Sequence, residues 1–286
     1  MSDVSNFFIP GAAGRLSVRS KGLSARPQQV VILVQGANMS GQMGYDFGFE
    51  GGTDYSMMDA LVAAGFGAIT FSVRGYALSD KVDDPFSVQT DAAIEDLASV
   101  VAWVQAQGWA RPHLLGWSWG GRITGRYVQN HAGDVDRLVL MDPALGGGNK
   151  IPPVPTEALW HNTYAYFIER LEPEFSEDAA REALARRMDS EELLAPNGIR
   201  LENALGTTRV EADQVTRPTL MVYGSAAAKQ NYMQGGWDRL DFYAQLATED
   251  KAFVLIPGCG DYAHLQRPRQ RIYQACIDFL RQASAD

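Results

Sequence analysis

Short apolar runs alternate along the chain with longer stretches in which apolar residues recur every three or four positions. The short runs are rich in β-branched and aromatic residues and cover positions 30–34, 68–73, 138–141, 219–223 and 252–256. Runs that are apolar throughout indicate parallel strands buried on both faces, and the longer stretches between them indicate helical crossovers. The pattern therefore predicts an α/β protein with a mostly parallel sheet of about eight strands flanked by helices.

Further elements are predicted around this core. Residues 7–9 and 16–18 have the pattern of an antiparallel pair at one edge of the sheet. Thr90 can cap a helix with an apolar stripe, and Gly108 can end it. Cys276 lies on the apolar stripe of a C-terminal helix that we expect to pack on the sheet, so we interpret it as a packed thiol.

The alternation breaks between residues 146 and 215. This region has no strand-like run, is rich in Glu, Ala, Arg and Leu, and has three prolines at its entrance, Pro152, Pro153 and Pro155. We predict that residues 146–215 form a helical cap inserted after the sixth strand, and that residues 1–145 and 216–286 form the core domain. The expected helices of the cap cover 156–169, 177–188 and a short stretch near Leu201.

Composition narrows the classes of function. The net charge of -9 and the lack of a basic block argue against nucleic acid and anionic membranes as partners. No apolar stretch is long enough to span a bilayer, and the N-terminus lacks the pattern of a secretory signal. Cys259 and Cys276 form no disulfide framework. We expect a cytoplasmic protein that acts on a small molecule, and we leave open whether it forms a homodimer.

The sequence Gly-Trp-Ser-Trp-Gly at 116–120 is the clearest chemical signal. It follows the apolar end of a predicted strand and precedes a segment that can form a helix. In such a strand–turn–helix, glycines leave room for a strained turn that exposes the serine hydroxyl. The next amide then faces a developing oxyanion. This context favours Ser118 as a nucleophile over a serine in an ordinary glycine turn.

Four features together resemble the α/β-hydrolase fold family. They are Gln35-Gly36-Ala37 after one strand, the segment 74–79 after the next, the elbow at 116–120, and a histidine in the loop after the last strand. Gln35 and Ala77 stand where the family has histidine and glycine. The resemblance implies Ser118 as nucleophile, an oxyanion hole made by the main-chain amides of Ala37 and Trp119, and no metal or cofactor.

The base and the acid of the implied triad are assigned by chain order, which in this family is nucleophile, acid, histidine. Of the four histidines, only His264 fits, although the family often has its base where this chain has Asp261. The loop 223–228 offers no carboxylate, so we assign the acid to Asp142 at the end of the sixth strand. The alternative, that Asp142 only caps the entry to the cap, stays open.

The resemblance and the aromatic content predict the reaction. The long stretch 36–56 is rich in Met and aromatic residues, as expected for an apolar acyl or aryl group. Residues expected to contact substrate are Met39, Trp117, Trp160 and Tyr164, with packing an equal alternative for Trp117. We predict a serine hydrolase that cleaves a carboxylic ester or lactone through an acyl-enzyme.

Two other functions stay open. The first is an aminopeptidase or amidase similar to proline iminopeptidases, which would bind an amine with cap glutamates such as Glu157, Glu169, Glu172 and Glu174. The second is a ligand-binding hydrolase relative with little turnover, indicated by the alanines after Tyr223 and by the shifted histidine. A dehalogenase or epoxide hydrolase is disfavoured, because those relatives have aspartate in the place of Ser118.

Overall fold

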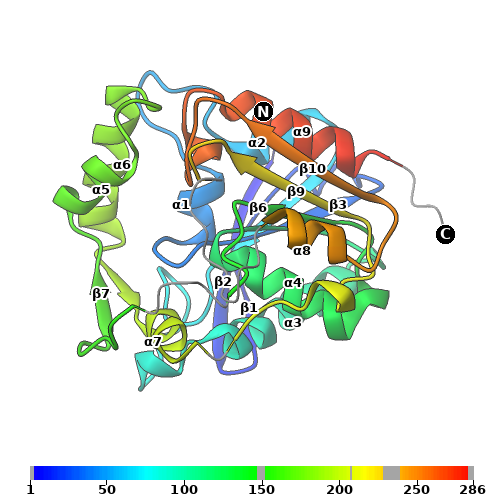
Figure 1. The fold of residues 1–286 in the computed structure, drawn as a ribbon, viewed down its shortest axis with the longest axis horizontal. Coiled ribbons are helices and arrows are strands. Elements are labelled where there is room, and N and C mark those ends of the chain that lie inside the picture. Colours follow the sequence, from blue (N-terminus) through cyan, green and yellow to red (C-terminus); the bar gives the residue numbers. More distant parts are fainter. Residues whose placement is uncertain (1–2, 147–151, 207, 228–238, 283–286) are drawn as a thin grey trace.

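The computed structural model describes residues 3–146, 152–206, 208–227 and 239–282 (Figure 1). Eight strands form one sheet in the order β1-β2-β4-β3-β5-β6-β9-β10. Their bounds are Val4–Gly11 (β1), Gly14–Lys21 (β2), Val30–Val34 (β3), Gly67–Phe71 (β4), His113–Trp117 (β5), Leu138–Met141 (β6), Thr219–Gly224 (β9) and Lys251–Ile256 (β10). The pairs β1–β2 and β2–β4 are antiparallel and the others parallel. The predicted mostly parallel sheet is confirmed, as is its antiparallel edge.

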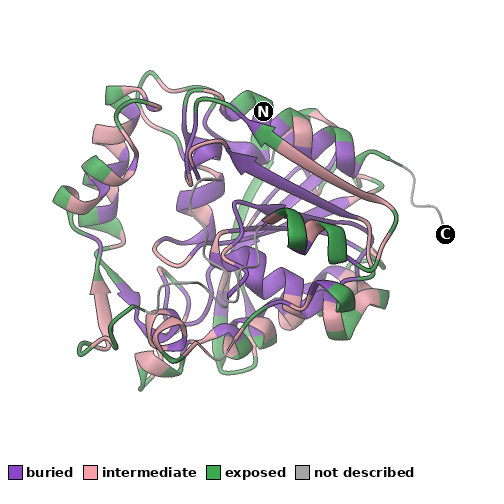
Figure 2. Ribbon diagram, in the orientation of Figure 1, coloured by how far each residue is buried: buried purple, intermediate pink, exposed green. Residues whose placement is uncertain are grey.

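Helices cover both faces of this sheet because side chains of successive strand residues point to opposite faces. Val30, Ile32 and Val34 of β3 pack in one core cluster, with residues of α3, α4 and α8. Val31 and Leu33 pack in the other, with residues of α1, α2 and α9. The bounds are Gly41–Tyr45 (α1), Met57–Ala63 (α2), Thr90–Ala106 (α3), Trp119–His131 (α4), Arg239–Gln245 (α8) and Arg269–Leu280 (α9). Figure 2 shows the resulting buried centre.

The two ends of helix α3 test the predicted caps. Helix α3 begins at Thr90 itself, with Gln89 as its N-cap, so the prediction of Thr90 as cap was wrong. The Thr90 hydroxyl instead donates to Glu202 (2.5 Å) and accepts from the Trp119 indole (3.0 Å). Gly108 has a φ of +106° just beyond the end of α3, as expected for a helix stop.

In α9, Cys276 is buried as predicted.

Residues 152–206, which we call the insert, lie beside the sheet and carry five elements (Figure 1). They are Leu159–His161 (β7), Tyr164–Arg170 (α5), Asp178–Glu191 (α6), Leu194–Pro196 (β8) and Gly198–Leu205 (α7). Strands β7 and β8 pair antiparallel, so the expectation of a region without strands was wrong. The first helix begins at Tyr164, because the Thr163 side chain caps it by accepting from the Tyr166 amide.

The predicted division into a core of 1–145 and 216–286 and a cap of 146–215 stays a prediction. Parts of both lie outside the described residues, namely 1–2, 147–151, 207, 228–238 and 283–286. Among the described helices, none has the length and apolar character needed to cross a bilayer.

Candidate active site

Ser118 occupies a strained turn between β5 and α4. Its φ of 53° and ψ of -117° lie in a region that non-glycine residues rarely adopt. Backbone crowding explains the flanking glycines: a Cβ on Gly116 would lie 2.1 Å from the Gly120 carbonyl oxygen, and one on Gly120 would lie 2.1 Å from that of Val34. The sequence thus forms the strand–turn–helix expected of a nucleophile elbow. The role of Ser118 as nucleophile stays a prediction.

The two amides predicted to form an oxyanion hole lie at the ends of neighbouring elements. Trp119 is the first residue of α4, and the first amides of a helix have no acceptor within it. Ala37 lies in the loop after β3, and its carbonyl accepts from the Tyr76 hydroxyl (2.8 Å). The Gln35 side chain accepts from the Val73 amide (3.0 Å). Gln35 therefore ties the loop after β3 to the loop after β4.

Ser118 lines a cavity of about 150 Å³. The polar and charged side chains that share this lining are Asp142, Arg170, Tyr223, Arg239 and Asp261, and the rest of it consists of Pro143, Ala144 and Ala227. Ala227 and Asp261 are the positions where sequence analysis noted the missing acid and the displaced base. Two hydroxyl-bearing, two carboxyl-bearing and two guanidinium-bearing residues therefore line one small space.

Asp142 lies at the carboxyl end of β6 with a φ of 39°. Its Oδ1 accepts from the Gly224 amide (2.9 Å), which joins the ends of β6 and β9. Its Oδ2 is buried, and in the part of the chain that the structure describes it has no hydrogen-bond partner. Burial, and then the nearby Asp261, raise the pKa of Asp142 well above its ordinary value. Burial therefore favours the protonated form of this carboxyl group.

Asp261 presents the second carboxyl group of the cavity. It forms an ion pair with Arg170 of α5 (3.0 Å), and its main-chain carbonyl accepts from the Trp117 indole (2.7 Å). The insert thus reaches the cavity through Arg170. Two carboxyl groups in different environments, one buried with a raised pKa and one paired with a cation, can act as acid and base.

His264 lies elsewhere. Its side chain is completely buried, with its ring 4.6 Å from that of Trp117 and 5.7 Å from that of Tyr45. Within the described residues neither ring nitrogen has a hydrogen-bond partner. Burial lowers the pKa of His264 to about 3, so the imidazole is neutral. The cavity lining, as far as the chain is described, does not include it.

Ser118 and Asp142 thus line the same cavity, whereas His264 is not among the described residues of that lining, so its role as base stays a prediction. The expected triad also requires an imidazole bonded to a carboxylate, and no such bond forms here within the described residues. His264 lies in the short 3₁₀ turn Ala263–Leu265, and the Tyr273 hydroxyl of α9 donates to its carbonyl (2.7 Å). Its neighbours Ala263 and Leu265 belong to the core cluster packed by α1 and α9.

The residues expected to contact substrate have mostly structural surroundings. Met39 and Trp117 are buried in the core cluster on the α9 side of the sheet. The Tyr164 hydroxyl donates to Glu182 (2.5 Å) within the insert. Trp160 contacts Tyr166 edge to face, with ring centroids 5.4 Å apart, and lies under the guanidinium of Arg200 (3.9 Å). Trp160 therefore lies beside a cation that could bind an anionic ligand.

Sequence reasoning missed the arginines of this region. Arg170 and Arg200 come from α5 and α7 of the insert, where no motif marks them. The cap glutamates considered for binding an amine are placed differently: Glu157, Glu169 and Glu174 are exposed, and Glu172 accepts from Gln266 (2.9 Å). Among the residues that the structure describes, no group of three His, Cys, Asp or Glu side chains could hold a metal ion.

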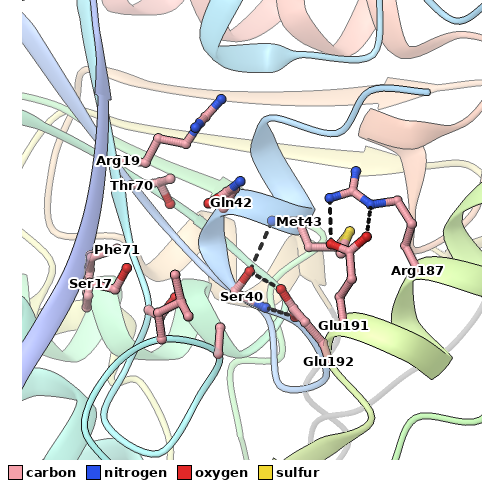
Figure 3. A pocket seen from close by; sticks show the side chains of 13 residues that line it. Ser17, Arg19, Ser40, Gln42, Met43, Thr70, Phe71, Arg187, Glu191 and Glu192 are labelled. Carbon is pink, nitrogen blue, oxygen red and sulfur yellow. Dashed lines mark hydrogen bonds and ion pairs between the residues drawn. The ribbon is translucent and has the colours of Figure 1, made fainter. Parts of the chain in front are cut away.

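A second cavity, of about 230 Å³, shows how the insert holds the loop after β3 (Figure 3). Glu192, at the end of α6, accepts from the amide of Ser40 (2.6 Å) and from its hydroxyl. The Asn162 side chain donates to the Asn38 carbonyl (2.6 Å). Burial raises the pKa of Glu192. The residues next to Ala37 are thus bonded to the insert at several points.

Comparison of amino-acid sequences shows that this chain is similar to known proteins. A family model described as "alpha/beta hydrolase fold" matches residues 29–240. The AB hydrolase superfamily protein YisY of Bacillus subtilis (strain 168) is 34% identical over 99 residues, 34% of this chain and 35% of that protein. A 2-hydroxy-6-oxononadienedioate/2-hydroxy-6-oxononatrienedioate hydrolase of Escherichia coli O139:H28 is 34% identical over 102 residues, 36% of this chain and 34% of that protein. The matched stretch thus covers about a third of each relative.

Comparison of structures gives matches over nearly the whole chain. The enol-lactonase from Burkholderia xenovorans LB400 has a TM-score of 0.69, with 96% of this chain and 100% of that one covered. The two sequences are 16% identical. At that identity the likeness shows a shared fold.

Proposed function

Because the chain belongs to the alpha/beta hydrolase fold family, we propose that it is a serine hydrolase that cleaves a carboxylic ester or lactone through an acyl-enzyme on Ser118. One observation carries the proposal: Ser118, held at a φ of 53°, lines a cavity together with Asp142 and Asp261. Exposure of a hydroxyl on such a turn is how this fold presents a nucleophile. An apolar acyl or aryl portion of the substrate remains a prediction from the sequence.

In this proposal the two carboxyl groups perform the proton transfers. Asp261 accepts the proton of Ser118 as its oxygen attacks the carbonyl carbon, and the amides of Ala37 and Trp119 stabilise the oxyanion. Protonated Asp142 then donates its proton to the alkoxide as it departs. The acyl group remains on Ser118 as the acyl-enzyme. A carboxylate is a weaker base than an imidazole, with ordinary pKa values of about 4 and about 6.5. We therefore expect slow turnover that persists in mild acid.

Hydrolysis of the acyl-enzyme reverses these roles. Water attacks the acyl carbon and gives a proton to Asp142, and Ser118 departs with the proton held by Asp261. The site then has its starting protons. The ion pair between Asp261 and Arg170 (3.0 Å) supports the proposal that Asp261, and not Asp142, carries a negative charge between turnovers.

The test is labelling and turnover with a matched serine control. Ser118→Ala should abolish labelling by a fluorophosphonate probe and lower the kcat for p-nitrophenyl esters by at least about 1000-fold, as in other serine hydrolases. Ser190→Ala, which removes an exposed hydroxyl of α6, should change neither. Labelling of the Ser118→Ala protein at the rate of the native protein would exclude Ser118 as nucleophile.

A second candidate function is ligand binding with little turnover. The burial of His264 away from the cavity favours it, because no imidazole then assists Ser118. Removal of one triad member can cost about four orders of magnitude in rate. Ester turnover that Ser118→Ala abolishes would exclude this candidate. Ligand binding without measurable turnover would favour it.

A further inference from the structure

Arg200 is a partly buried cation whose hydrogen-bond partners among the described residues are all neutral. Its two terminal nitrogens donate to the side-chain oxygens of Asn38 (2.5 Å) and Asn197 (3.0 Å). Its guanidinium lies flat over Trp160, 3.9 Å from the ring centroid. Burial lowers the pKa of Arg200. The side chain is therefore fixed in position without a counter-ion from the protein.

Other buried arginines of the chain differ in this respect. Arg74 pairs with Asp96 (2.7 Å), Arg122 with Glu202 (3.4 Å) and Arg269 with Asp54 (2.7 Å). Across residues 3–146, 152–206, 208–227 and 239–282, no Asp or Glu oxygen lies within 4.0 Å of Arg200. An uncompensated cation in a partly buried place is unfavourable for the folded protein. Its presence calls for an anion that the described residues do not supply.

Arg200 lies next to the groups expected to stabilise the oxyanion. Its partner Asn38 adjoins Ala37, and the Tyr76 hydroxyl donates to the Ala37 carbonyl (2.8 Å). The Tyr76 ring lies 6.1 Å from that of Trp119. The ionisable side chains that influence Arg200 are Tyr76, Tyr166 and Tyr262, which come from the core, the insert and the loop after β10. Arg200 thus faces the interior between the insert and the core.

We propose that Arg200 binds a carboxylate of the substrate, so that the ester or lactone cleaved at Ser118 carries a second, anionic group. This rests on the proposed function. A guanidinium has five N–H donors in one plane, and a carboxylate accepts two of them side by side. Asn38 and Asn197 occupy one donor on each terminal nitrogen, and Trp160 fixes the plane. The remaining donors are free for the ligand.

The orientation of Asn38 supports a built subsite. Its Nδ2 lies 3.2 Å from the Tyr166 hydroxyl, which directs its Oδ1 to Arg200. A purely structural Arg200, which would only hold the loop after β3 through Asn38, predicts a loss of stability on its removal. A ligand-binding Arg200 predicts the opposite, since removal relieves an unpaired charge.

The first experiment compares two esters of equal acyl length in the full chain. The p-nitrophenyl monoester of glutaric acid ends in a carboxylate, and p-nitrophenyl pentanoate ends in a methyl group. Arg200→Gln should lower kcat/KM for the anionic ester by about 100-fold, typical of a lost buried charge pair, and change that for the neutral ester by less than about threefold. Arg186→Gln, which removes an exposed cation of α6, should change neither. An equal fall for both esters would contradict the proposal.

The second experiment separates this inference from the proposed function. Glutarate binding to the Ser118→Ala protein is measured by calorimetry, with and without Arg200→Gln. We expect at least a tenfold loss of affinity, and a melting temperature that holds or rises. If glutarate binding needs Arg200 while neither ester is cleaved, hydrolysis at Ser118 is wrong and the anion subsite stands. Affinity that does not change, or no measurable binding to either protein, overturns the subsite.

Discussion

The turn at Ser118 and the loop after β10 lie close together, yet they are determined in different ways. At the turn, Gly116 and Gly120 contact main-chain atoms of their own segment and of the adjacent β3. In the loop, Gln266 accepts from the Gly260 amide (2.7 Å) and donates to Glu172 of the insert (2.9 Å). A local strained turn leaves a motif in the sequence. A loop held by distant partners does not.

This difference explains why the turn at Ser118 could be predicted from the sequence and the surroundings of His264 could not. The glycine pattern at 116–120 has one structural solution, because larger residues would collide with the backbone. The direction of the His264 side chain depends on Trp117, Tyr45 and Tyr273, which come from three other elements. Chain order and a nearby strand end could not predict that direction.

The largest expected effect comes from filling the turn. Gly120→Ala should lower the free energy of unfolding by at least about 3 kcal/mol, because its Cβ would lie 2.1 Å from the Val34 carbonyl oxygen and main-chain atoms would have to move. Urea unfolding measures this. Gly133→Ala is the control, since a Cβ there meets nothing within 4 Å, and it should change stability by less than about 0.5 kcal/mol. Equal effects would show that the turn is not tightly packed.

The second expected effect distinguishes the catalytic contribution of Asp261 from that of His264, both in the loop after β10. Asp261→Asn should lower kcat/KM for a p-nitrophenyl ester by about 100-fold, because it removes the proposed base. His264→Leu should stay within about threefold of the native protein, because the imidazole lies outside the cavity. Thermal unfolding of both variants checks that each is folded at the assay temperature. The reverse order of effects would restore His264 as the base.

The third expected effect is an acid dependence of stability that originates at His264. The pKa of this group is lowered to about 3 in the folded chain and is about 6.5 when unfolded. Between these values the unfolded chain binds more protons, so stability falls as the pH falls, by at most about 1.4 kcal/mol per pH unit. His264→Leu should flatten the unfolding free energy between pH 6.5 and 4.

The control for this effect is an exposed histidine. His161→Gln changes a histidine on the surface of β7 and should leave the pH dependence as it is in the native protein. If His264→Leu and the native protein lose stability in parallel as the pH falls, another group, such as buried His113, causes the loss.

The sheet could be predicted because buried parallel strands require continuous apolar runs, as in β3 and β6. The insert could not be predicted to the same degree. Strands as short as β7 and β8 have no periodic pattern, and helix α5 begins where Thr163 caps it and not at residue 156. Asp142 could be found because parallel sheets present functional groups at strand ends. Arg170 and Arg200 could not, since only tertiary packing brings them to the core.

The bonds between the insert and residues 38–40 have a mechanical consequence. Glu192 bonds to Ser40 and Asn162 bonds to Asn38, immediately after Ala37. A displacement of the insert that breaks these bonds would also release the main chain that carries the Ala37 amide. Admitting a ligand and stabilising negative charge at that amide would then alternate in time, with the second restored only when the insert returns.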